Sequence, residues 1–179
     1  IHCGLVGSEM CIRDSNSSKG FKMNTEKNIK TLVVKKPLKL DCGKTINNFP
    51  IAFETYGSLN ENKDNAILVF HALTGDQFVT GLNPITKKDG WWSFAVGPDK
   101  AIDTKKYFVI CSNVIGGCMG SYGPSHKDPE TQKTFGTDFP VITINDMVNA
   151  QYNLLEHFGI NKLFAITGGS MGGMQVLQF

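Results

Sequence analysis

The chain has 179 residues, of which 41% are hydrophobic and 19% are charged, and its formal net charge is +2 at pH 7. This length and composition allow one globular domain with a sizeable core, and the near-neutral charge gives no reason to expect a nucleic acid or a membrane surface as partner. No run approaches the roughly 18 apolar residues that a membrane-spanning helix needs, and no secretory signal is evident. We therefore expect a cytoplasmic protein.

The first residues look foreign to the rest of the chain. Residues 1–15 resemble a translated sequencing adapter, and Arg13 is the only arginine, although lysine is frequent elsewhere. We expect residues 1–22 to be a non-native or disordered leader, with Met23 as the natural start; an authentic flexible tail is the alternative. Residues 23–179 are expected to form the N-terminal part of one domain, which is incomplete because the sequence stops inside a helix-prone segment.

The next part of the chain is rich in β-prone residues. Short runs at Thr31–Val34, Leu38–Leu40 and Phe49–Thr55 alternate with turn residues, which predicts antiparallel edge strands. Ala66–His71 and Tyr107–Cys111 are continuous apolar runs of the kind found in strands that are buried on both faces.

A long loop and a helix follow these strands. Asn113–Pro140 is rich in Gly, Ser, Pro and Asp and far exceeds the usual loop length of about 4 to 6 residues, which indicates a functional loop. Apolar residues then recur at helical spacing and predict an amphipathic helix over Asn145–Phe158. Thr143 or Asn145 is available as its N-cap, and Gly159 as its C-terminal stop.

The last segment carries the strongest motif. Leu163–Thr167 is predicted as a third buried strand, and it runs into Gly168-Gly-Ser-Met-Gly172 before a helix-prone end, Met174–Phe179. Gly-x-Ser-x-Gly between a strand and a helix is the nucleophile elbow of the α/β-hydrolase fold, so we predict Ser170 as the nucleophile. Gly168 and Gly172 would supply the clearance that a tight turn needs.

The motif and the order of elements predict an α/β fold. We expect a mostly parallel sheet with antiparallel N-terminal edge strands, truncated after the nucleophile elbow. A glycine-rich helix start that binds phosphate is the alternative interpretation of the segment. It is weaker, because neither the P-loop pattern nor Gly-x-Gly-x-x-Gly fits Gly168 to Gly173.

A second motif, His71-Ala-Leu-Thr-Gly-Asp76, follows the first buried strand, where open α/β sheets place their ligands. In this fold the loop after that strand supplies one oxyanion-hole donor, and the residue after the nucleophile supplies the other. We predict the N–H groups of Leu73 and Met171 as this pair, and Thr74 as a substrate contact. An ordinary strand-end turn is the alternative.

The histidines and helix carboxylates are not expected to act in catalysis. His71, His126 and His157 all precede Ser170, whereas this fold orders its triad as serine, acid and histidine. His157 is expected at the surface or core rim and His126 in a loop. Asp146 and Glu156 are expected to be solvated charges of the predicted helix.

The cysteines and histidines suggest neither a disulfide framework nor a metal site. Outside the leader the cysteines are Cys42, Cys111 and Cys118, an odd count at spacings that fit no zinc cluster. We expect reduced thiols, with Cys111 and Cys118 in structural positions, and no metal.

Four blocks in order resemble the homoserine O-acetyltransferase family of the α/β-hydrolase fold, over Lys39 to Phe179. They are His71-Ala-Leu-Thr-Gly-Asp76, Asn113-Val-Ile-Gly-Gly-Cys-Met-Gly-Ser121, Phe139-Pro-Val-Ile-Thr-Ile-Asn-Asp-Met-Val148 with Gln151, and Gly168-Gly-Ser-Met-Gly-Gly-Met-Gln175. Tyr122 departs from the family, which more often has a smaller residue there, and this bears on the shape of the acyl pocket.

The resemblance implies a two-step acyl transfer. Ser170 would take an acetyl, or succinyl, group from acetyl-CoA or succinyl-CoA, and the hydroxyl of L-homoserine would remove it, in methionine biosynthesis. The acyl-CoA is a co-substrate, with no bound cofactor, and the complete protein is expected to be a homodimer. The triad acid, its histidine and the arginine that holds the substrate carboxylate would lie beyond Phe179, so residues 23–179 alone are expected to be inactive and marginally folded.

Three alternatives remain open at this point. A serine hydrolase or esterase of the same fold would give the acyl group to water, and the Asn113–Ser121 block argues against it because generic esterases lack that block. A serine O-acyltransferase, or another acceptor, fits the same residues. A member that only binds ligands is disfavoured by the intact Ser170.

Overall fold

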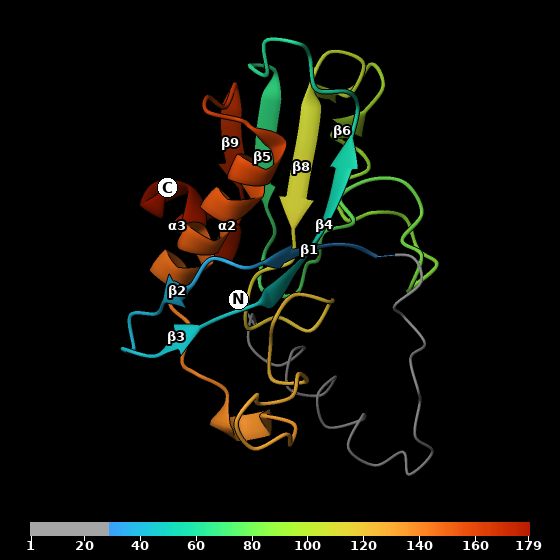
Figure 1. The fold of residues 1–179 in the computed structure, drawn as a ribbon. Helices are drawn as coiled ribbons and strands as arrows, with labels where there is room; N and C mark the ends of the chain where they lie inside the picture. The colour runs from blue at the N-terminus through green and yellow to red at the C-terminus, as the bar shows by residue number, and fades with distance from the viewer. Residues whose placement is uncertain (1–28) are drawn as a thin grey trace.

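The computed structural model describes residues 29–179, so the predicted leader, residues 1–22, lies outside the described part of the chain. The elements in chain order are β1 (Lys30–Val34), β2 (Leu38–Lys39), β3 (Thr45–Ile46), β4 (Phe49–Tyr56), β5 (Ala66–Phe70), β6 (Val96–Gly97), β7 (Ile102–Asp103), β8 (Phe108–Ser112), the 3-10 turn η2 (Gly136–Asp138), α2 (Ile144–Phe158), β9 (Ala165–Gly168) and α3 (Met171–Gln178). Figure 1 shows α2 and α3 beside a central sheet.

The central sheet has the strand order β1-β4-β8-β5-β9. β5 pairs in parallel with both β8 and β9, whereas β4 runs antiparallel to both β1 and β8. β4 is therefore the one strand of this sheet that runs against the others. The predicted α/β fold, with a mostly parallel sheet and antiparallel pairing at its N-terminal edge, is confirmed.

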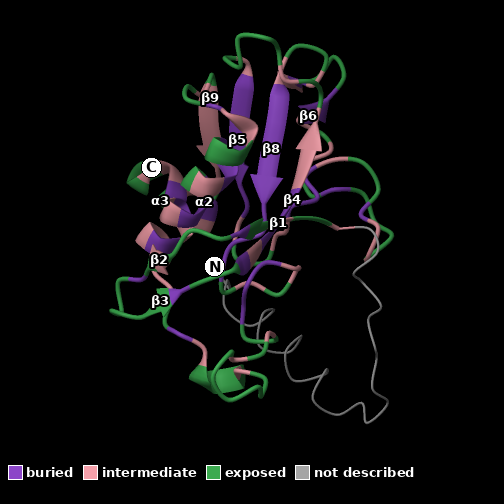
Figure 2. Cartoon of the chain, in the orientation of Figure 1, coloured by how far each residue is buried: buried purple, intermediate pink, exposed green. Residues whose placement is uncertain are grey.

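β5 and β8 form the buried centre of the sheet, as Figure 2 shows. One face, which includes Leu68 and Ile110, packs against Leu154 and Leu155 of α2. The opposite face packs against the segment between β5 and β8, from which Val79, Val96 and Trp92 contribute side chains. Because both faces are covered, the two strands consist almost entirely of apolar residues.

β9 differs from the prediction in its burial. The sequence predicts a third buried strand over Leu163–Thr167, but every residue of β9 is only half-buried. The reason is its position: β9 is the edge strand of the described sheet and has a neighbour, β5, on one side only. An apolar run cannot reveal whether a strand is central or at an edge.

α2 ends at the predicted residue, Phe158, and begins at Ile144, one residue before the predicted start. Thr143 is the N-cap of a reciprocal capping box with Asp146, and Gly159 closes the helix in the left-handed conformation at φ 67°. Asp146, which the sequence predicts to be a solvated helix charge, is instead fully buried. Its carboxylate accepts hydrogen bonds from the Asp41 N–H and the Thr143 N–H, both at 2.9 Å. Glu156 is exposed, as expected.

Of the small strands, the sequence predicts β2, within Leu38–Leu40, but not β3, β6 or β7. β3 pairs antiparallel with β2 in a separate hairpin, and β6 pairs in parallel with β7. Each of these strands has only two residues, too short to show alternation of apolar and polar side chains.

No helix among the described residues has the length and apolar character to cross a membrane.

Candidate active site

Ser170 occupies the turn between β9 and α3. Its backbone has φ 57° and ψ −124°, a strained conformation for a residue with a side chain. Ser170 is the N-cap of α3, but its side chain makes no capping hydrogen bond. The residue is exposed, and the Met174 N–H donates to its carbonyl oxygen at 3.2 Å. The turn therefore presents the hydroxyl outward at the start of a helix.

The two motif glycines lie where a side chain would collide with the backbone. A β-carbon at Gly172 would lie 2.2 Å from the Phe70 carbonyl oxygen, and one at Gly168 would lie 2.7 Å from the backbone of Gly172. Gly169, in contrast, has open space at this position. The close approach of β9, α3 and the end of β5 thus requires glycine at positions 168 and 172.

The loop after β5 faces the elbow. A turn in which the Gly75 N–H donates to the Ala72 carbonyl oxygen at 2.9 Å exposes Leu73, whose exposed fraction is 76%. Leu73 and Met171 line the same cavity of about 360 Å³. Within residues 29–179, neither of their N–H groups donates a hydrogen bond in the turns and loops, as expected for Met171 in the first turn of a helix.

The cavity beside the elbow is mainly apolar. Ser170 itself does not line it, but the adjacent Met171 does. None of the described residues that border the cavity is Asp, Glu, Lys or Arg; the others are His71, Gly75, Asn113, Val114, Ile115, Gly116, Gly117, Cys118, Pro124, Gly136, Phe139, Pro140, Ile142 and Met147. Among residues 29–179 no three His, Cys, Asp or Glu side chains group as a metal would require.

The first part of the long loop forms one wall of this cavity and is fixed to the sheet. The Ser121 hydroxyl donates to the Asn113 carbonyl oxygen at 2.5 Å and accepts from the Ala52 N–H at 2.9 Å. The Asn113 N–H in turn donates to the Ala52 carbonyl oxygen at 2.8 Å. Both ends of the Asn113–Ser121 block are therefore held by one residue of β4.

Asp76 anchors the far end of the loop after β5. Its carboxylate accepts from the Phe78 N–H at 2.8 Å and from the Asn83 amide at 2.9 Å. Its carbonyl oxygen accepts from the Trp91 indole N–H at 2.9 Å. The sequence motif ended at Asp76 without revealing this role, because its partners come from the loop that follows.

The cysteines divide into one buried and one exposed group. Cys111 is fully buried, and burial raises the pKa of its thiol far above the ordinary value. Its structural assignment fits this position. Cys118 does not pack in the core: it is exposed and lines the cavity beside the elbow.

His126 and His157 lie in the surroundings that the sequence predicts for them. His157 is exposed on α2, and His126 is a half-buried loop residue whose Nδ1 accepts from the Gly123 N–H at 3.2 Å. His71 is buried at the end of β5, with an exposed fraction of 1%. Burial lowers the pKa of its imidazole, so the ring is neutral at pH 7.

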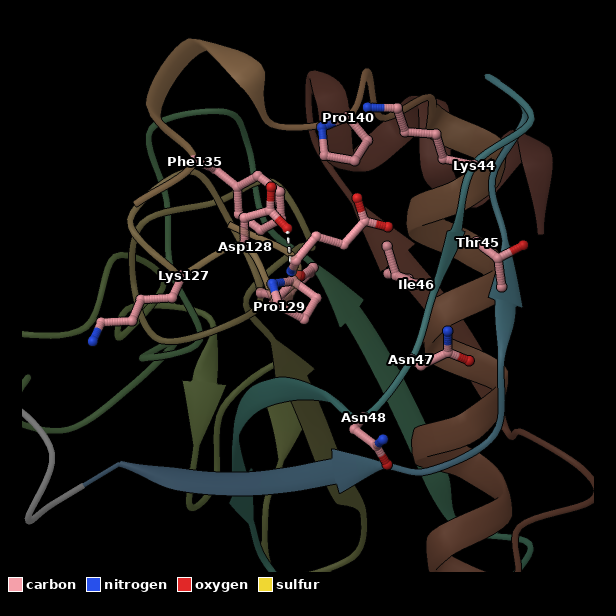
Figure 3. A pocket seen from close by; sticks show the side chains of 12 residues that line it. Lys44, Thr45, Ile46, Asn47, Asn48, Lys127, Asp128, Pro129, Phe135 and Pro140 are labelled. Carbon is pink, nitrogen blue, oxygen red and sulfur yellow. Dashed lines mark hydrogen bonds between the residues drawn. The ribbon is translucent and has the colours of Figure 1, made fainter. Parts of the chain in front are cut away.

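A larger cavity, of about 630 Å³, lies away from the elbow (Figure 3). It separates the β2-β3 hairpin, with Thr45 and Asn47, from the later part of the long loop, with Asp128 and Phe135. Of the residues that line it, only Pro140 also lines the cavity beside the elbow.

Tyr122 lines this larger cavity and packs against Phe49, Phe135 and Phe139. Tyr122 therefore borders the larger cavity directly and reaches the cavity beside the elbow only through Phe139, which lines it. Size alone does not make the larger cavity the site, because it contains none of the predicted site residues.

Comparison with known sequences identifies relatives along most of the chain. The family described as alpha/beta hydrolase fold matches residues 65–179. Homoserine O-acetyltransferase of Pelagibacter ubique is 76% identical over 157 residues, which is 88% of this chain and 42% of that protein. The enzyme of the same name from Mesorhizobium japonicum is 61% identical over 144 residues, 80% of this chain and 37% of that protein. The chain thus spans less than half the length of these relatives.

Comparison with solved structures gives the same fold and two kinds of enzyme. Homoserine O-acetyltransferase from Bacillus anthracis superposes with a TM-score of 0.75 at 34% identity, covering 84% of this chain and 42% of that one. Esterase E22 superposes with a TM-score of 0.74 at 37% identity, covering 82% of this chain and 42% of that one. These two structures do not separate transferase from esterase, whereas the sequence relatives at 61% and 76% identity are both named as transferases. The chain therefore belongs to the α/β-hydrolase fold family, in its homoserine O-acetyltransferase branch.

Proposed function

We propose that the complete enzyme transfers an acetyl group from acetyl-CoA to the hydroxyl of L-homoserine through an acyl-enzyme at Ser170. The observation that carries this proposal is the strained Ser170 turn at the start of α3. The Ser170 hydroxyl makes no capping hydrogen bond to the helix, and the turn lies beside an apolar cavity. The strong identity to proteins named homoserine O-acetyltransferase supports the choice of donor and acceptor.

The first step would be attack of the Ser170 hydroxyl oxygen on the thioester carbonyl carbon. The carbonyl oxygen becomes an oxyanion, for which we propose the N–H groups of Leu73 and Met171 as donors because both residues line one cavity and neither group is used in a turn or loop. The positive end of the α3 dipole adds to this stabilisation. Collapse of the tetrahedral intermediate breaks the carbon–sulfur bond and releases coenzyme A as its thiol.

The second step would be attack of the homoserine hydroxyl on the acyl-serine ester, which returns the Ser170 hydroxyl and gives O-acetylhomoserine. We assign the base that takes the proton from each hydroxyl, and returns it to the leaving group, to a histidine held by an acid; both would follow Ser170 in the order that this fold uses. Thr74, which is exposed on the loop beside Leu73, is proposed as a substrate contact.

The donor, cellular site and assembly are parts of the same proposal. We propose acetyl-CoA rather than succinyl-CoA because the relatives are named as acetyltransferases, and the described lining of the cavity has no Lys or Arg to pair with a succinyl carboxylate. A role in methionine biosynthesis, a cytoplasmic location and a homodimer are proposed on the same relationship, with no metal and no bound cofactor.

Acyl transfer to water is the second candidate function, because esterase E22 shares the fold at 37% identity. The deciding experiment incubates the complete enzyme with acetyl-CoA and measures thiol release with and without L-homoserine, together with O-acetylhomoserine and acetate. We expect thiol release to depend on homoserine and to match O-acetylhomoserine formation, and S170A to abolish both. Thiol release that is independent of homoserine and matched by acetate would identify an esterase.

A further inference from the structure

His71 is a buried polar residue to which the proposed reaction gives no part. It lies at the carboxyl end of β5, directly before the loop that carries Leu73, and its exposed fraction is 1%. Its ring touches two segments that are far apart in sequence, the loop after β5 and the start of the Asn113–Ser121 block.

The neighbours of the ring determine which nitrogen carries its proton. The Asn113 side-chain oxygen accepts from the Met119 N–H at 3.0 Å, so the Asn113 amide nitrogen is the atom that faces His71 Nε2, at 3.3 Å. The Val114 N–H also points at Nε2, at 3.2 Å. Both neighbours are donors, so Nε2 must be an acceptor without a proton.

The proton therefore lies on Nδ1, which donates to the Ala72 carbonyl oxygen at 2.7 Å. A second proton would lie on Nε2, against two donors. Burial also opposes that second proton, although the nearby Asp76 carboxylate acts in the opposite direction. The ring is thus held neutral in one tautomer by the residues around it.

This hydrogen bond bears on the proposed oxyanion donor through the peptide plane. The carbonyl of Ala72 and the N–H of Leu73 belong to one peptide group, which is planar and trans, so they point in opposite directions. A donor that fixes the Ala72 oxygen thereby fixes the direction of the Leu73 N–H. The Gly75 N–H, at 2.9 Å from the same oxygen, closes the turn from the other side.

We propose that His71 is a positioning residue that aims the Leu73 N–H at the oxyanion, and that the Asn113–Ser121 block holds the His71 ring in the tautomer this requires. The inference rests on the proposed function only in taking the Leu73 N–H as an oxyanion donor. It gives the Asn113–Ser121 block a role in catalysis without contact to the reacting atoms.

Two substitutions separate the two sides of the ring. The amide nitrogen of asparagine occupies the place of Nδ1, so His71→Asn keeps the donor to the Ala72 oxygen and loses the acceptor at Nε2. The amide of glutamine reaches the place of Nε2, so His71→Gln keeps an acceptor for the Val114 N–H and loses the donor. His71→Phe keeps the ring shape and neither hydrogen bond.

The test uses the complete enzyme and measures the rate constant of Ser170 acylation by p-nitrophenyl acetate and by acetyl-CoA, with the Tm of each variant. We expect H71N to acylate within about tenfold of the wild type, and H71Q and H71F to be slower by about 100-fold, as on loss of one oxyanion donor. The donor concentration that gives half-maximal acylation should change less than the acylation rate constant does. H71N should acylate faster than H71F even if the smaller side chain of asparagine gives H71N the lower Tm of the two.

A purely structural role predicts the reverse order, in which rate follows Tm and side-chain size, and that order would overturn the inference. A measurement on the wild type needs no variant to fold: the ring nitrogen chemical shifts of His71 should show a proton on Nδ1 and none on Nε2 at pH 7. A proton on Nε2 would also overturn it. If the wild type is acylated at Ser170 but passes the acetyl group only to water, the proposed acceptor fails while the order of the variants still decides the role of His71.

Discussion

Gly172 lies against the end of β5 so closely that a β-carbon on it would stand 2.2 Å from the carbonyl oxygen of Phe70. Real β-carbons do not approach backbone atoms to this distance, so α3 can start where it does only with glycine at this position. The contact joins the nucleophile turn to the strand that leads into the loop with Leu73. This close approach therefore helps to set the position of the nucleophile turn relative to the proposed oxyanion loop.

Gly172→Ala should displace the start of α3 from β5 and disturb the Ser170 turn. We expect a lower Tm, and a fall in acylation rate of about 100-fold or more if the Met171 N–H moves from the oxyanion. Gly169→Ala is the matched control for stability, because a β-carbon there meets open space. Differential scanning calorimetry and stopped-flow acylation of both variants give the comparison. Equal Tm values for G172A and G169A would show that the close approach is not needed.

Gly75→Val tests the turn that presents Leu73. A β-carbon at Gly75 would meet the His71 Cβ at 3.0 Å and the Ala72 oxygen at 3.3 Å, so the two further methyl groups of valine have no room without a shift of the turn. We expect kcat to fall by about 100-fold and KM to change less, because the oxyanion exists only in the transition state. A folded variant with unchanged kcat would remove this loop from the oxyanion hole.

Asp146→Ala should destabilise the fold, whereas Glu156→Ala should not. Asp146 is fully buried and accepts two backbone hydrogen bonds, and its loss leaves the Asp41 N–H and the Thr143 N–H without their acceptor. We expect a cost of about 2 kcal/mol in the free energy of unfolding, in the range for a lost N-terminal cap and an unsatisfied donor. Glu156 is exposed, so E156A should stay within about 0.5 kcal/mol of the wild type. Chemical denaturation measures both; equal effects would contradict the structural difference.

His71 should make stability depend on pH in a defined range. Its pKa is lowered in the folded protein from an ordinary value of 6.5, so between that value and the lowered one the unfolded chain binds more protons. Neutral His71 therefore lowers the free energy of unfolding by nothing above about pH 6.5, and this free energy falls as the pH drops from there toward the lowered pKa. Asp41 and Asp103, whose pKa values are lowered from 3.8, act only at more acidic pH. The loss of unfolding free energy from pH 7.5 to 5.5 should be smaller in H71F than in the wild type; equal losses would contradict this.

The elements with local signals could be predicted from the sequence. Gly159 marked the end of α2, and the choice of N-cap was narrowed to Thr143 or Asn145, because capping is decided by neighbouring residues; the glycines around Ser170 marked the elbow. The burial of Asp146 and the edge position of β9 could not be predicted, since both depend on segments that approach from elsewhere in the chain. The same holds for His71, whose tautomer is set by Asn113 and Val114, 42 and 43 residues away.

The exposed Cys118 gives a reactivity test of the cavity. Cys118 lines the cavity beside the elbow, Cys42 is exposed in the β2-β3 hairpin region, and Cys111 is buried with a raised thiol pKa. Iodoacetamide should therefore label Cys118 and Cys42 and spare Cys111. Alkylation should inactivate the complete enzyme and the C42S variant alike, while C118S should keep its activity under the same treatment. Inactivation of C118S at the wild-type rate would show that Cys118 does not border the acyl site.

The most direct test of the central claim is the chemical fate of an acetyl group on Ser170. The complete enzyme is mixed with isotope-labelled acetyl-CoA, separated rapidly from excess donor, and divided between buffer and L-homoserine before peptide mass spectrometry. We expect the label on the peptide that contains Ser170, and its transfer to O-acetylhomoserine on addition of the acceptor at a rate far above its loss to water. Label on Cys118 or another residue, or a Ser170 ester that homoserine does not discharge, would contradict acyl transfer through this serine.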